Sequence, residues 1–158
     1  MSAKQHKTAE DVKLMLIKIP PEANTVEKFE QLLENLHESA HGEVIGLEIV
    51  SYNQHIYFYA RVNSKIKELV EGQIYASYPY AEIEISDEYA YLDEERIKKF
   101  KCAELQLARS DIYPIKTFHH FDGDSLAGLG AILSKLEDNE EAWIQIITIL
   151  EADSWSLN

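Results

Sequence analysis

The densest group of side chains that could do chemistry is the stretch HHFDGD at residues 119–124. It places two imidazoles and two carboxylates within six consecutive residues. Imidazole nitrogens and carboxylate oxygens are common ligands of divalent metals in proteins. A metal site here would use His119, His120, Asp122 and Asp124.

The D-G-D part of this stretch resembles that of metal-dependent phosphoesterases that cleave short nucleotides, which implies a small hydrolase as one alternative. In that family a histidine stands four residues before the first aspartate, and Phe118 occupies that place here. The family also uses a downstream D-H-H element, which this sequence does not contain. The sequence favours a simpler interpretation, a polar loop in which Gly123 makes the turn and Asp124 caps the next helix.

Other catalytic patterns are missing from the sequence. No stretch matches the phosphate-binding motif G-x-x-x-x-G-K-[ST] or the dinucleotide motif G-x-G-x-x-G, so Gly128 and Gly130 favour close helix packing instead. No G-x-S-x-G element exposes a serine, and the single cysteine, Cys102, lacks an activating motif. We therefore expect no enzymatic activity and no cofactor.

Two tyrosines are candidates for a contact surface. Tyr57 and Tyr59 alternate with apolar residues, so both point to the same face of an expected strand. RNA-recognition modules stack bases on aromatic residues at this place, but they add glycine and basic residues around them. The chain carries 28 acidic and 15 basic residues, a net charge of −13, which argues against direct nucleic-acid binding. Packing against the second half of the chain, or contact with a protein partner, explains the tyrosines better.

Composition sets the class of protein. The chain has 158 residues, of which 46% are hydrophobic and 27% charged, as expected for a globular α+β domain. No apolar stretch approaches the roughly 20 residues that a membrane span needs. The polar N-terminus lacks the core of a signal peptide, and one cysteine fits a reducing compartment. We expect a cytoplasmic protein with a disordered lead over residues 1–12.

Apolar periodicity orders the elements that position these residues. Strands are expected at 14–20, 44–50, 55–62 and 81–86, with helices at 24–40 and 64–78. The apolar stripe of the first helix comprises Val26, Phe29, Leu32, Leu33 and Leu36. The order β-α-β-β-α-β predicts a ferredoxin-like subdomain over residues 13–86.

The rest of the chain predicts a second, β-β-α-β subdomain over residues 101–158, joined by a charged linker at 87–100. Ala103 to Ile115 fits two short strands, and Ser125 to Leu136 fits a helix with its leucines inward. Ala142 to Leu150 is nearly all apolar, which predicts a strand buried on both faces.

Three segments carry a family resemblance: EGQIYASYPYAEI at 71–83, DIYPIKTF at 111–118 and AWIQIITILEADSW at 142–155. Together they resemble the N-terminal region of type IV secretion or conjugation ATPases of candidate-phyla bacteria. The resemblance implies an accessory or assembly domain that acts through protein–protein contacts, with a P-loop motor domain or secretion-system components as partners. It also implies a place at the inner face of the membrane through a parent complex. Because the sequence shows neither the anchor nor the motor of such proteins, we expect an excised domain or a free-standing paralogue.

Overall fold

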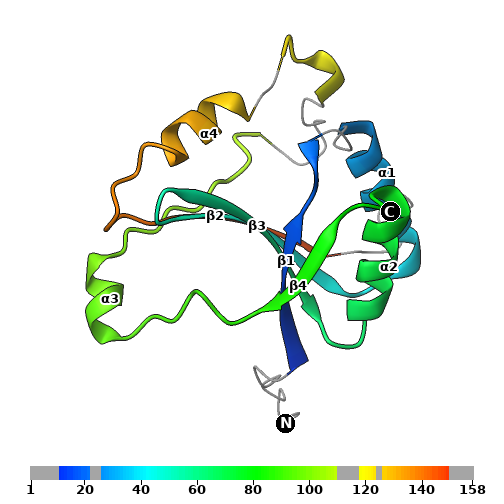
Figure 1. Ribbon diagram of the computed structural model, residues 1–158, viewed down its shortest axis with the longest axis horizontal. Helices are drawn as coiled ribbons and strands as arrows, with labels where there is room; N and C mark the ends of the chain where they lie inside the picture. The colour runs from blue at the N-terminus through cyan, green and yellow to red at the C-terminus, as the bar shows by residue number, and fades with distance from the viewer. Residues whose placement is uncertain (1–10, 22–25, 110–117, 124–125, 150–158) are drawn as a thin grey trace.

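The computed structural model describes residues 11–21, 26–109, 118–123 and 126–149. These residues form an α+β fold, as the sequence predicts, with one five-stranded sheet and four α-helices (Figure 1). The strands are β1 (Val12–Lys18), β2 (Val44–Tyr52), β3 (His55–Asn63), β4 (Glu82–Ser86) and β5 (Ala142–Ile149). The helices are α1 (Val26–Ser39), α2 (Lys67–Ser77), α3 (Glu94–Lys99) and α4 (Ala127–Leu133), with a short 3₁₀ turn at Phe118–His120.

The sheet has the strand order β4-β1-β3-β2-β5, and every neighbouring pair is antiparallel. The elements of residues 12–86 follow the predicted order β-α-β-β-α-β. β2 and β3 are joined by a two-residue turn in which Asn53 and Gln54 both have positive φ angles, 49° and 61°. This is the geometry of a type I′ turn, whose twist matches that of the two strands.

The main core lies between one face of the sheet and the helices α1 and α2. Leu32 and Leu36 of α1 and Val70 and Ile74 of α2 are buried there. The strands supply Met15, Ala60, Val62 and Ile45 from the facing side. Burying an aliphatic side chain of this size contributes about 1.5–3 kcal/mol, so this layer holds the sheet in place.

The first helix buries a narrower arc than its apolar stripe predicts. Leu32 and Leu36 are buried, whereas Phe29 and Leu33 remain more than a third exposed. At 100° per residue, Phe29 and Leu33 lie on one side of the stripe and the two buried leucines on the other. The contact with the sheet and α2 covers only the latter side. The predicted cap of this helix, Asn24, lies outside the described residues, as do residues 1–10 of the expected disordered lead.

The second half of the chain departs from its prediction in three places. Residues 103–109 form no strand, and the remainder of that predicted pair, 110–115, lies outside the described residues. α4 is shorter than predicted, with Leu126 at its N-cap position and without a side-chain cap. β5 is not buried on both faces; it pairs with β2 alone among the described strands. The subdomain boundaries themselves stay a prediction, although β5 and the first four strands share one sheet.

The helix α4 is tied to the hairpin end of β2. The hydroxyl of Ser51, which is fully buried, donates a hydrogen bond to the carbonyl oxygen of Leu133 at 2.9 Å. Leu133 is also buried, whereas Leu126, which was predicted to point inward, is exposed. A helix of two turns can bury only a few side chains on a sheet, which explains why one leucine dominates the contact.

Candidate functional site: a tyrosine groove on the open face of the sheet

Residues 87–100, which we call the crossing segment, run across the sheet face opposite α1 and α2 (Figure 1). The segment leaves β4 at one edge and reaches β5 at the other, where Phe100 packs on Trp143 with ring centroids 4.5 Å apart. Within it, α3 begins after Asp93, whose carboxylate accepts from the backbone N–H groups of Glu95 and Arg96. The segment that the sequence predicts to be a charged linker therefore packs on the sheet and contains a short helix.

A buried carboxylate fixes this segment to the sheet. Glu48 of β2 is only 4% exposed and accepts from Arg61 Nε of β3 at 2.6 Å and from the Tyr89 hydroxyl at 2.6 Å. Gln145 of β5 donates to the same carboxylate at 3.3 Å. The other side of the Arg61 guanidinium donates to both carboxylate oxygens of Glu88. One network thus joins β2, β3, β5 and the crossing segment.

A glycine in β2 leaves the space that the Arg61 side chain of this network occupies. Gly46 lies opposite Arg61 in the β2–β3 register, and a Cβ atom added at Gly46 would meet the Arg61 Cβ at 3.2 Å. A larger residue there would displace the arginine stem from the face of the sheet. Glu48 is two residues further along β2, so it shares this face with Gly46.

The charges of the network alter the acidity of its members. Hydrogen bonds to Glu88 and Glu48 raise the pKa of Arg61 well above its ordinary value, so the guanidinium stays charged. Burial, together with the hydrogen bond to Glu48, raises the pKa of Tyr89, which therefore keeps its donating proton. The hydrogen bonds from Arg61 lower the pKa of Glu88 below its usual 4.5.

The lowered pKa of Glu88 predicts an acid-dependent loss of stability. A carboxyl group whose folded-state pKa lies below its unfolded value stabilises the fold above the unfolded value and loses that contribution as the pH falls. We expect the difference in free energy of unfolding between the wild type and Glu88→Gln to shrink as the pH falls through and below 4.5. Urea unfolding of both proteins across this range measures it. A difference that stays constant or grows in acid contradicts the assignment.

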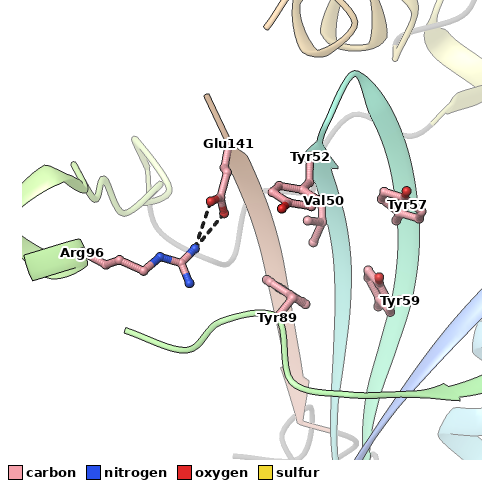
Figure 2. Close-up of a pocket in the computed structure, with 7 residues that line it drawn as sticks. All are labelled: Val50, Tyr52, Tyr57, Tyr59, Tyr89, Arg96 and Glu141. Atoms are coloured by element: carbon pink, nitrogen blue, oxygen red, sulfur yellow. Dashed lines mark hydrogen bonds and ion pairs between the residues drawn. The ribbon is translucent and has the colours of Figure 1, made fainter. Parts of the chain in front are cut away.

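Beside this network the open face is hollowed into a groove of about 520 Å³ (Figure 2). We call it the tyrosine groove; it is lined by Val50, Tyr52, Tyr57, Tyr59, Tyr89, Arg96 and Glu141. Figure 2 shows Tyr57 and Tyr59 of β3 on one side and Arg96 and Glu141 on the other. Val50 and Tyr52 of β2 lie between the two sides.

Aromatic contacts order the tyrosine wall. The rings of His55, Tyr57 and Tyr59 follow one another along β3 with centroids 6.3 Å apart. Tyr59 stacks on Tyr89 at 5.4 Å, and Tyr89 meets Trp143 edge to face at 5.1 Å. The opposite wall is an ion pair, in which one guanidinium nitrogen of Arg96 donates to both oxygens of Glu141 at 2.9 and 3.0 Å. The tyrosine wall is suited to stacking against a planar or cationic group.

The sequence-derived candidates for contact, Tyr57 and Tyr59, both lie in this groove. Tyr59 contacts the crossing segment through Tyr89, whereas Tyr57 lies between His55 and Tyr59 in the row of rings. Whether they bind a partner stays a prediction.

The sequence-derived metal candidates lie elsewhere. His119 and His120 are exposed in the 3₁₀ turn, and Asp122 is exposed after it, whereas Asp124 lies outside the described residues. His119 Nε2 lies 3.8 Å from the carboxylate of Glu30 in α1. Among the residues that the structure describes, no group of three or more histidine, cysteine or acidic side chains could hold a metal ion. The proposed set of four ligands stays a prediction.

Sequence reasoning missed Glu48, Tyr89, Arg96 and Glu141 as parts of a site. One signal was available: Glu48 is the one charged residue of β2, and Arg61 lies on the same face of the neighbouring strand. A buried acid on a strand normally requires a cationic or hydroxyl partner. The partners from the crossing segment had no local signal, because Glu48 and Tyr89 are 41 residues apart.

No helix among the described residues is long and apolar enough to cross a membrane. Comparison of the chain with protein-family models, with curated proteins and with solved structures finds no match.

Proposed function

We propose that this chain is a non-catalytic assembly domain that binds protein partners in the tyrosine groove. In the context suggested by the sequence resemblance, it serves a type IV secretion or conjugative DNA-translocation ATPase on the cytoplasmic side of the membrane. The observation that supports the proposal is the groove itself. One wall is a row of tyrosine rings, and the opposite wall is the ion pair of Arg96 and Glu141, whose charges neutralise one another.

The construction of the groove favours binding by a preformed surface. Tyr59 and Tyr89 are held by stacking, and Tyr89 is anchored to the buried carboxylate of Glu48. Rigid aromatic side chains supply a large contact area at a low cost in conformational entropy, and tyrosine is enriched among residues that dominate binding energy.

Charge favours a basic partner segment. The whole chain carries a net charge of −13. Glu141 in the groove and Glu88 beside it are paired with Arg96 and Arg61. Asp138 accepts from the neutral side chain of Gln54 at the hairpin end next to Tyr52, so it adds a negative charge there. Tyrosine faces attract guanidinium and ammonium groups, and an acidic surface accelerates the approach of a basic partner. We therefore assign the groove to an extended basic segment of a partner protein.

The non-catalytic part of the proposal is tested by incubating the purified chain with ATP and magnesium. We expect no phosphate release above a buffer control and no protection against thermal unfolding by the nucleotide. Release that scales with protein concentration and survives repeated purification contradicts this part. The binding part is tested separately with a basic peptide, so that the failure of one part is distinguishable from failure of the other.

A further inference from the structure

The strand β5 forms an unusual edge of the sheet. Within the described residues it pairs with β2 on one side, and its eight residues, AWIQIITI, include no charged residue, proline or glycine. Proteins normally protect such edges with charges, prolines, bulges or very short strands, because an open edge of about 26 Å offers unpaired backbone groups to another strand. β5 has none of these devices.

Exposed apolar side chains accompany the edge on both faces of the sheet. Ile147 and Ile149 are 71% and 61% exposed on the open face, where Ile149 lies opposite the exposed Val44 of β2. Ile146 is exposed on the face that carries α1 and α2. A strand that pairs with this edge would therefore form backbone hydrogen bonds and cover isoleucines on both faces of the sheet.

The opposite edge is protected in the usual manner. β4 is five residues long and carries Glu82 and Glu84, the second of which pairs with Lys18 at 2.8 Å. A second copy of the chain pairing through β4 would bring these acids together on its outermost strands. Pairing through β5 would place only uncharged side chains opposite one another, even though the whole chain carries a net charge of −13.

From this contrast we propose that β5 pairs with β5 of a second copy of the chain, in an antiparallel and symmetric dimer. An uncharged, isoleucine-rich strand is complementary to itself, and antiparallel pairing of identical strands closes under a two-fold axis. The alternative, β5 of one copy against β4 of the next, would leave open edges at both ends and would place Glu82 and Glu84 beside the isoleucines. The symmetric pairing continues the antiparallel pattern into a ten-stranded sheet.

The symmetry has a consequence for the groove. The two-fold axis that relates antiparallel strands of one continuous sheet is perpendicular to that sheet, so both open faces lie on the same side. Trp143, which packs on Tyr89 at the groove, belongs to the pairing strand. The dimer therefore presents two tyrosine grooves side by side, and a partner with two basic segments could occupy both.

The test is the oligomeric state of the full chain, measured by sedimentation velocity and by light scattering from micromolar to millimolar concentration. We expect a concentration-dependent dimer in the wild type. Ile147→Lys puts one positive charge on each of the two paired β5 strands of the dimer. It should therefore raise the dimer dissociation constant at least about tenfold. Ile149→Lys serves as the second variant should the first lose its fold, as judged by circular dichroism.

Ile85→Lys is the matched control, because Ile85 is a half-exposed isoleucine on the opposite edge strand, β4. It should leave the dimer unchanged. A wild type that remains monomeric throughout the concentration range overturns the proposal. So does a dimer that survives both β5 substitutions or that dissociates in the control variant.

Discussion

Replacing Glu48 with alanine is expected to lower the free energy of unfolding by about 2–4 kcal/mol. The carboxylate is buried and accepts from Arg61, Tyr89 and Gln145, so its removal leaves three donors without their shared acceptor. Arg61 keeps Glu88, which limits the loss. Urea unfolding followed by tryptophan fluorescence measures the effect, and Trp143 reports directly on the loss of packing by Tyr89.

The matched control for this prediction lies in the same row of the sheet. In the strand register, Glu84 of β4 lies opposite Leu16 of β1, and Glu48 lies opposite Tyr59 of β3. Leu16 and Tyr59 are themselves partners, so Glu84 and Glu48 belong to one row across the sheet. Glu84 is more than half exposed and forms an ion pair with Lys18, so Glu84→Ala should cost less than about 1 kcal/mol. Equal losses for the two variants would show that burial of Glu48 contributes nothing to stability.

Replacing Tyr57 with alanine is expected to weaken binding of a basic peptide at least about tenfold, which corresponds to about 1.4 kcal/mol. Tyr57 lines the groove and does not contact the buried network directly, so the fold should be retained. Isothermal titration with the repeat peptide (Arg-Gly)₅ measures the dissociation constant for both proteins. The same experiment at higher salt should show weaker binding, because opposite charges attract the peptide.

Tyr80→Ala is the control for this loss of an aromatic ring. Tyr80 is 77% exposed and lies outside the groove, between α2 and β4. It should leave the affinity for the peptide unchanged. If Tyr57→Ala binds as tightly as the wild type, or if Tyr80→Ala loses as much affinity, the peptide does not occupy the groove.

Local patterns in the sequence predicted the first four strands and first two helices because each element carries its own periodicity. The alternation through Tyr57 and Tyr59 placed both tyrosines on one face of β3, which the structure confirms. The strands expected at 44–50 and 55–62 leave only a short connection, and the positive φ angles of Asn53 and Gln54 give that connection the required twist.

The covering of the open face could not be predicted in the same way. Arg61 and Glu88 are 27 residues apart, and Glu48 and Gln145 are 97 apart, so their contact depends on the path of the whole chain. β5 shows the same limit, since an apolar run predicts a strand without telling whether it lies at the centre or the edge of a sheet. An uncharged, isoleucine-rich strand at the edge of a sheet breaks the usual relation between burial and hydrophobicity.

Nuclear magnetic resonance can show whether an extended basic segment of a protein binds in the tyrosine groove. The isotopically labelled chain is titrated with (Arg-Gly)₅ and, separately, with (Glu-Gly)₅. We expect saturable shifts from the arginine peptide that are concentrated at Tyr57, Tyr59, Tyr89 and Glu141, and none from the glutamate peptide. Shifts that scatter over the acidic surface away from the groove, or that are the same for both peptides, would contradict it.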